Sequence, residues 1–368
     1  MKFLYNFHFI FYKTTIQKAS ENNDVEIIYY LLLEVQTIKY NLFKGNKKIT
    51  HIAIPSSVTT IEKEAFRDCS SLTLISIPSS LTSINECTFY ECSSLEEIII
   101  PSSVTKIEMN AFRGCSSLMQ ITIPSSITSI DRNIFIRCSS LSQILILSSL
   151  TSIEFGTFIE CSSLTQFLIP LSIKEIGEDA FERCSSLTQI IIPPSVTKID
   201  HHSFSKCSSL KQISFVIPSS VEYIGSSAFG ECSSLAQIII PSPVKNIWAA
   251  AFFKCTSLAQ VSIPSSLTEI YYDAFNGCSS LTHVTFANPS SVTKIENNAF
   301  RGCISLKQIT IPSSVISIRE HVFDGCISLK QILIPSSVTS IGECAFDGCI
   351  SLTQILIPSS VTSIGKCA

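Results

Sequence analysis

The sequence predicts a mostly β solenoid of about 13 stacked repeats of 23 residues, and three observations support this prediction. The stretch from Ile334 to Leu356, IPSSVTSIGECAFDGCISLTQIL, recurs with small edits from about Ile49 to the last residue. Each copy carries a phenylalanine three residues before a cysteine, from Phe66 to Phe346. A unit this short cannot bury its own apolar side, so a fixed period indicates stacked neighbours. The repeat cysteines are Cys69, Cys92, Cys115, Cys138, Cys161, Cys184, Cys207, Cys232, Cys255, Cys278, Cys303, Cys326 and Cys349.

Composition supports a large core and argues against several classes of protein. Hydrophobic residues make up 45% of the 368 residues and charged residues only 15%, so Ser and Thr fill much of the polar surface. The net charge is −3, with +3 in residues 1–48 and −6 in the remainder. A mildly acidic repeat body argues against nucleic acid as a partner. No apolar run reaches about 18 residues, so we expect no membrane-spanning segment.

Residues 1–48 lie outside the repeat, and we expect them to form an atypical helical N-terminal cap. Ser20 is expected to cap a helix over residues 21–34, which has acidic residues in its first turns. Such a cap would cover the apolar face and open strand edges of the first repeat. The first residues, MKFLYNFHFIFYKTT, faintly resemble a secretory signal, although Asn6 and His8 interrupt the apolar run. A cleaved signal and a retained segment both stay open.

Residues 49–368 are expected to form the solenoid, with three sides in each repeat. In the first side Ile355 and Ile357 are two residues apart, so both point inward on a strand that a proline ends. The second side is extended, with Val338 and Ile341 inward. The third side is a turn or short helix held inward by the repeat phenylalanine and cysteine. Neighbouring copies are then about 5 Å apart, the spacing of paired strands.

Two steps of the repeat are 25 residues long, and the chain ends within its last copy. The longer steps add two residues just before Pro218 and just before Pro289. Insertions at one corner of a repeat map to one edge of a solenoid, where they form local bulges or mark a binding site. The chain stops at Ala368, immediately before the next expected phenylalanine. An uncapped edge there would favour self-association.

The pattern IPSSVTSIGECAFDGCISL resembles the BspA-like leucine-rich repeats, also called the Treponema-type class. The resemblance covers residues 49–368, about 87% of the chain. It implies an α/β-type leucine-rich repeat solenoid that is curved, with a parallel sheet on its concave side. It also implies a surface protein that binds host proteins, matrix or other cells, and no catalytic residue is carried over.

Two outward columns of the first side suggest recognition. One is nearly all glutamine, which favours either an amide ladder or a polar recognition stripe. The next column mixes small hydroxyl residues with aliphatic ones, and apolar surface of this kind marks a partner site or a self-association surface. Simple drift of the repeat is the alternative. The aliphatic candidates are Ile99, Leu145, Leu168, Ile191, Ile239, Leu333 and Leu356.

Aromatic residues gather in two neighbouring repeats and are further candidates for partner binding. Trp248 and Tyr271 share one repeat position, and Phe253 and Tyr272 follow nearby, with Tyr223 one repeat earlier. Surface aromatics are enriched at protein interfaces. Ordinary stacking between repeats is the alternative interpretation.

No residue pattern indicates catalysis, a cofactor or a metal site. Thirteen of the 16 cysteines occupy one repeat position, which favours a buried column of free thiols. His201 and His202 precede a column cysteine, but their spacing matches no zinc pattern. His321, Cys344 and Cys367 share another column, where a disulfide or a metal site is a minor alternative.

These observations favour a non-enzymatic scaffold that engages a protein partner through the concave sheet. The resemblance places it at the cell surface or outside the cell, as an adhesion-type protein or surface antigen. If the N-terminal signal is not real, an intracellular, cytoplasmic adaptor is the alternative. A self-assembling structural module is the third hypothesis.

Overall fold

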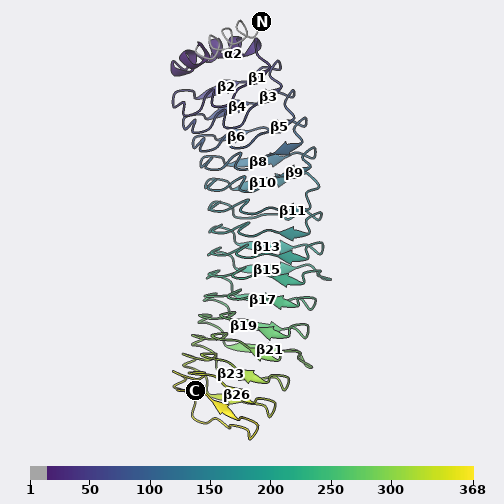
Figure 1. The fold of residues 1–368 in the computed structure, drawn as a ribbon, viewed down its shortest axis with the longest axis vertical. Helices are drawn as coiled ribbons and strands as arrows, with labels where there is room; N and C mark the ends of the chain where they lie inside the picture. Colours follow the sequence, from purple (N-terminus) through teal and green to yellow (C-terminus); the bar gives the residue numbers. More distant parts are fainter. Residues whose placement is uncertain (1–14) are drawn as a thin grey trace. The chain divides into compact units, whose positions relative to one another are not determined.

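Each turn of the chain runs through two strand-bearing sides and one side made of turns, and successive turns pair in parallel (Figure 1). The computed structural model describes residues 15–368. It divides into two compact units, Met1–Pro170 and Leu171–Ala368, and each unit is a parallel β-solenoid. We call the sides the long-strand sheet, the short-strand side and the turn side. The predicted solenoid fold is therefore confirmed.

The N-terminal unit contains one helix with described bounds, α2 (Val25–Leu33), before its strands. Its long-strand sheet is built from β2 (His51–Ala53), β4 (Leu74–Ser76), β6 (Glu97–Ile98), β8 (Gln120–Ile123) and β10 (Gln143–Ile146). Its short-strand side carries β1 (Thr37–Ile38), β3 (Thr60–Ile61), β5 (Ser83–Ile84), β7 (Lys106–Ile107), β9 (Ser129–Ile130) and β11 (Ser152–Ile153).

The C-terminal unit repeats this arrangement, with a long-strand sheet in the order β13-β15-β17-β19-β21-β23-β25. Those strands are β13 (Gln189–Ile192), β15 (Gln212–Phe215), β17 (Gln237–Ile239), β19 (Gln260–Ile263), β21 (His283–Phe286), β23 (Gln308–Thr310) and β25 (Gln331–Leu333). The short-strand side has β12 (Glu175–Ile176), β14 (Lys198–Ile199), β16 (Tyr223–Ile224), β18 (Asn246–Ile247), β20 (Glu269–Ile270), β22 (Lys294–Ile295), β24 (Ser317–Ile318), β26 (Ser340–Ile341) and β27 (Ser363–Ile364).

Strand pairing keeps identical repeat positions opposite one another. Gln189 pairs with Gln212, and Gln237 pairs with Gln260. Alternation along each strand then separates buried from exposed columns, as in β13, where Ile190 is buried and Ile191 is exposed. A shift by one residue would expose every buried isoleucine, so the apolar pattern specifies the register.

The phenylalanine and cysteine columns form the centre of each unit. Phe229 is fully buried and stacks on Phe204 and Phe252, with ring centroids 5.5 Å apart on both sides. The thiol of Cys232 donates a hydrogen bond to the Phe204 carbonyl of the preceding turn at 3.1 Å, and equivalent bonds recur along the column. The predicted column of buried free thiols is confirmed, and each of these thiols also donates a hydrogen bond.

The turn side is neither strand nor helix, because two residues of each copy have positive φ. Asn298 has φ 60° and Gly302 has φ 67°, and Lys254 adopts the same conformation as Gly302 in an earlier turn, with φ 52°. The amides of Asn298 and Gly302 donate to carbonyls of the following turn at 3.0 and 2.8 Å. Of the two alternatives for this side, turns are therefore observed.

The N-terminal helical segment differs from the expected one. Ser20 lies inside helical residues 15–21, and the helix breaks before α2 because Asn23 adopts a left-handed φ of 57°. The expectation that Ser20 caps a helix over 21–34 is wrong. The buried Ser20 hydroxyl donates instead to the Gln17 carbonyl and accepts from Asn46 Nδ2.

Solenoid pairing begins before the first clear repeat. Strand β1 pairs with β3, and Phe43 stacks on Phe66 with centroids 4.9 Å apart. The turns therefore begin within residues 1–48, where the sequence pattern alone did not reveal them. Most of the stretch that resembles a secretory signal lies outside the described residues. Across residues 15–368, no helix is both long and apolar enough to cross a membrane.

Candidate partner-binding surfaces

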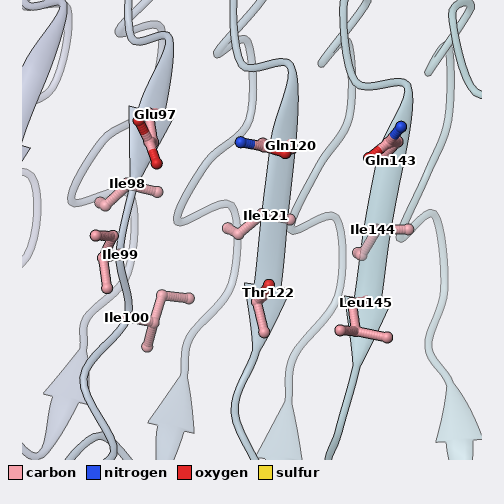
Figure 2. A pocket seen from close by; sticks show the side chains of 10 residues that line it. All are labelled: Glu97, Ile98, Ile99, Ile100, Gln120, Ile121, Thr122, Gln143, Ile144 and Leu145. Carbon is pink, nitrogen blue, oxygen red and sulfur yellow. The ribbon is translucent and has the colours of Figure 1, made fainter.

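The glutamine column lies on the outer face of the long-strand sheet, as predicted. Figure 2 shows Gln120 and Gln143 in one row with Glu97, above the inward isoleucines of β6, β8 and β10. Among the residues that the structure describes, these amides form no amide ladder. Gln212 Nε2 instead donates to the hydroxyl of Ser214 on its own strand at 3.0 Å. The glutamine column therefore exposes amide groups on this face of the sheet.

The aliphatic column is exposed but not continuous. Its seven predicted members are 50–78% exposed. Hydroxyl residues interrupt them, since Thr122 pairs with Leu145 and Ser214 pairs with Ile191 (Figure 2 shows the first pair). The column therefore offers separate exposed apolar stretches rather than one unbroken stripe. Directly consecutive aliphatic members occur at Leu333, which forms a parallel bridge to Leu356.

The first 25-residue step adds an apolar side chain that the column alone did not predict. Ile217 lies in the added residues and is 74% exposed. With Phe215, Ile239 and Pro241 it lines a shallow hollow of about 240 Å³, and Ile239 is 78% exposed. We call these four residues the Ile217 hollow. The 25-residue length of this repeat is the sequence feature that indicates where the hollow lies.

Charge on the long-strand sheet of the C-terminal unit has one sign. The segments from Leu187 to Pro358 that form this sheet contain three lysines and one histidine but no aspartate or glutamate. Lys211, Lys307 and Lys330 are exposed and form no ion pair in the described part of the chain. The Lys330 amide donates to the Lys307 carbonyl at 3.1 Å, so these two lysines lie on consecutive turns.

The predicted aromatic candidates separate into two places. Trp248 stacks on Tyr271 with centroids 5.1 Å apart, and Tyr223 lies 6.0 Å from Trp248 on the short-strand side. Phe253 instead lines a hollow on the turn side with neighbours such as Ala250. Tyr272 is 49% exposed. The row from Tyr223 to Tyr271 fits stacking between turns, with one unpartnered polar group, the buried indole nitrogen of Trp248.

The histidines and cysteines are not arranged as a metal centre. No group of three or more His, Cys, Asp or Glu side chains suited to a metal ion occurs within residues 15–368. His201 Nδ1 accepts from the Ser226 amide at 2.8 Å, and its Nε2 lies 3.2 Å from the Tyr223 hydroxyl. His201 therefore has a structural role on the short-strand side.

Comparison with known proteins gives the family. The model described as BspA type leucine rich repeat region (6 copies) matches overlapping stretches 36–165, 84–211, 128–255, 212–326 and 283–368. The chain belongs to the BspA-type leucine-rich repeat family. The resemblance predicted from the repeat is thereby confirmed, and the match begins at residue 36, one residue before β1.

One solved structure of the same repeat type supports this assignment, and two others match the chain as well. A leucine-rich repeat protein from Bacteroides ovatus is 33% identical, with 86% of this chain and 81% of that chain covered and a TM-score of 0.68. A leucine rich cell surface protein from Faecalibacterium prausnitzii is 29% identical over 91% and 83% of the two chains, with a TM-score of 0.48. A leucine-rich repeat protein from Eubacterium ventriosum is 23% identical over 89% and 83%, with a TM-score of 0.53. No curated protein matches the chain.

Proposed function

We propose that this BspA-type protein is a non-enzymatic scaffold that binds a protein partner on the long-strand sheet of its C-terminal unit. The Ile217 hollow is the observation that carries the proposal. Two aliphatic side chains, each about three-quarters exposed, line it: Ile217 just after β15 and Ile239 on β17. Large exposed aliphatics next to each other cost solubility and are typical of interaction sites.

The surrounding charge favours a partner segment that carries carboxylates. Lys211 lies one residue before β15, which contributes Phe215 to the Ile217 hollow, and Lys307 and Lys330 extend the positive face farther along the sheet. Because no carboxylate of this sheet offsets them, an acidic partner gains attraction without repulsion. The exposed glutamine column offers hydrogen bonds to the partner's polar groups. The proposed partner is therefore a protein segment that combines acidic and aliphatic side chains.

Paired substitutions test the apolar part of the proposal. Ile239→Glu places a charge in the Ile217 hollow, whereas Ile350→Glu is a matched control, 81% exposed on the turn side. We expect a partner captured by the unaltered protein to bind Ile350→Glu equally and Ile239→Glu at least about tenfold more weakly. Thermal unfolding should match for both variants. Equal binding by both variants, or no specific capture by the unaltered protein, would overturn the proposal.

A second pair tests the charge. Lys307→Glu with Lys330→Glu reverses the sign of the sheet, and Lys174→Glu changes an exposed lysine on the short-strand side. The rate constant for association with the partner at low salt should fall for the double variant and stay unchanged for the control. A faster association of the double variant would show that the partner is basic.

The cellular location of the protein distinguishes an adhesion-type function from that of an intracellular adaptor. Family resemblance supports a surface location, whereas the buried thiols that donate hydrogen bonds to phenylalanine carbonyls favour a reducing compartment. Protease shaving of intact cells, read with an antibody to the repeat body, separates the two. Loss of the band supports adhesion, and protection supports the adaptor.

A further inference from the structure

We propose that Cys344 and Cys367 form an oxidisable dithiol pair, which a low-molecular-weight disulfide converts into an intramolecular disulfide between consecutive turns. The two cysteines occupy the same turn-side position, one repeat apart. Neither belongs to the buried column that ends at Cys349. The pair has no role in the proposed partner site, so the two proposals stand independently.

Backbone pairing holds the two residues at disulfide distance. Ile341 pairs with Ile364 in parallel strands β26 and β27, and both cysteines follow these isoleucines by three residues. The Cys344 amide donates to the Lys366 carbonyl at 2.8 Å, so the turns stay paired at this point. Paired strands are about 4.8 Å apart, within the roughly 4.4–6.8 Å between Cα atoms that a disulfide spans.

The two thiols also lie near enough to influence each other's ionisation. Partial burial, together with the neighbouring Cys367 thiol, raises the pKa of Cys344. Two neighbouring thiols on paired turns are what a disulfide needs before it closes.

Exposure distinguishes Cys367 from the other cysteines. Cys367 is exposed, Cys344 and Cys349 are partly exposed, and the other 13 cysteines are buried. Buried thiols with raised pKa values react slowly because the thiolate is the nucleophile. An oxidant in solution therefore reaches Cys367 first.

The chemistry is thiol–disulfide exchange in two steps. The Cys367 thiolate attacks one sulfur of the small disulfide, forming a mixed disulfide and releasing one thiolate of the reagent. The Cys344 thiolate then attacks the Cys367 sulfur, forming the protein disulfide and releasing the second thiolate. Two protein thiols are oxidised, and one reagent disulfide is reduced to two thiols.

Oxidised glutathione added to the folded, fully reduced chain tests the proposal. Thiol titration after denaturation should fall from 16 to 14 per chain. Cleavage after lysine and before aspartate separates residues 331–346, residues 347–366 and residues 367–368, because Lys330, Asp347 and Lys366 flank them. We expect residues 331–346 linked to residues 367–368 and no glutathione retained.

Variants and alternative products make the result decisive. Cys344→Ser should stop at a glutathione adduct on Cys367, whereas Cys349→Ser should still form the disulfide. A stable adduct on Cys367 in the unaltered chain would overturn the proposal. So would a dimer linked through Cys367, a link to Cys349, or retention of all 16 thiols.

Discussion

The buried thiol column predicts loss of stability at mildly alkaline pH. Burial away from water raises the pKa of Cys278 from about 9 to about 12, and it also raises the pKa of Cys255 well above its ordinary value. Below pH 9 the thiols are protonated in both the folded and unfolded states, so their contribution to stability is fully present. Above pH 9 the unfolded state binds fewer protons, so the free energy of unfolding falls as pH rises.

The size of this effect follows from the shift. At pH 10 a thiol with pKa near 9 unfolded and near 12 folded contributes a loss of about 1.4 kcal/mol. Five column thiols with pKa values raised this far or farther would together lose about 7 kcal/mol, comparable with the whole stability of many domains. They are Cys69, Cys138, Cys232, Cys278 and Cys326.

Circular dichroism from pH 7 to pH 11, in the presence of a phosphine reductant, measures this loss. We expect unfolding between about pH 9.5 and 10.5. Lysines and tyrosines begin to titrate in the same range, so cysteine variants are needed to isolate the contribution of the thiols. Replacing Cys232 and Cys278 by alanine should reduce the slope of stability with pH by about 2.7 kcal/mol per pH unit. A folded chain whose urea midpoint is constant up to pH 10.5, or an unchanged slope in the double variant, would refute the reasoning.

The phenylalanine column and the left-handed turn positions give further predictions. Phe229→Ala should lower the free energy of unfolding in urea by about 3–5 kcal/mol, because it empties a buried site between two stacked rings. Phe253 is half-buried outside the column, so Phe253→Ala should lower it far less. Equal losses of stability would argue against the stacked core. Gly302→Ala should cost about 1–2 kcal/mol because its φ of 67° is unfavourable for a residue with Cβ, although no atom clashes. Lys254→Gly, at the equivalent position, should be neutral or stabilising by thermal unfolding, and a clear loss of stability would contradict the strain argument.

Much of the fold was predictable because the same residue types recur at a fixed period along the sequence. The inward side chains of the second side, Val338 and Ile341, are buried as the alternation predicts. Among inward positions of the first side, Ile332 and Ile334 are buried, whereas Ile357 in the last turn is 43% exposed. Repetition thus identified the columns and the register.

Features that occur once were harder to predict. Asn23 breaks the N-terminal helix, and one helical segment has no second copy against which to check its period. The Ile217 hollow depends on the path of two added residues, whose position the sequence gives but whose orientation depends on the backbone. Both bulges contain a cis peptide bond, before Pro218 and Pro289, which the step length did not reveal.

A photoreactive amino acid placed at Ile217 or at Ile350 tests the central claim most directly. Both side chains are exposed, at 74% and 81%, but only the first lies in the proposed site on the long-strand sheet. We predict that illumination in native cells crosslinks a partner from position 217 and not from position 350. Crosslinking from position 350 alone, or from neither position, would contradict partner binding through this sheet.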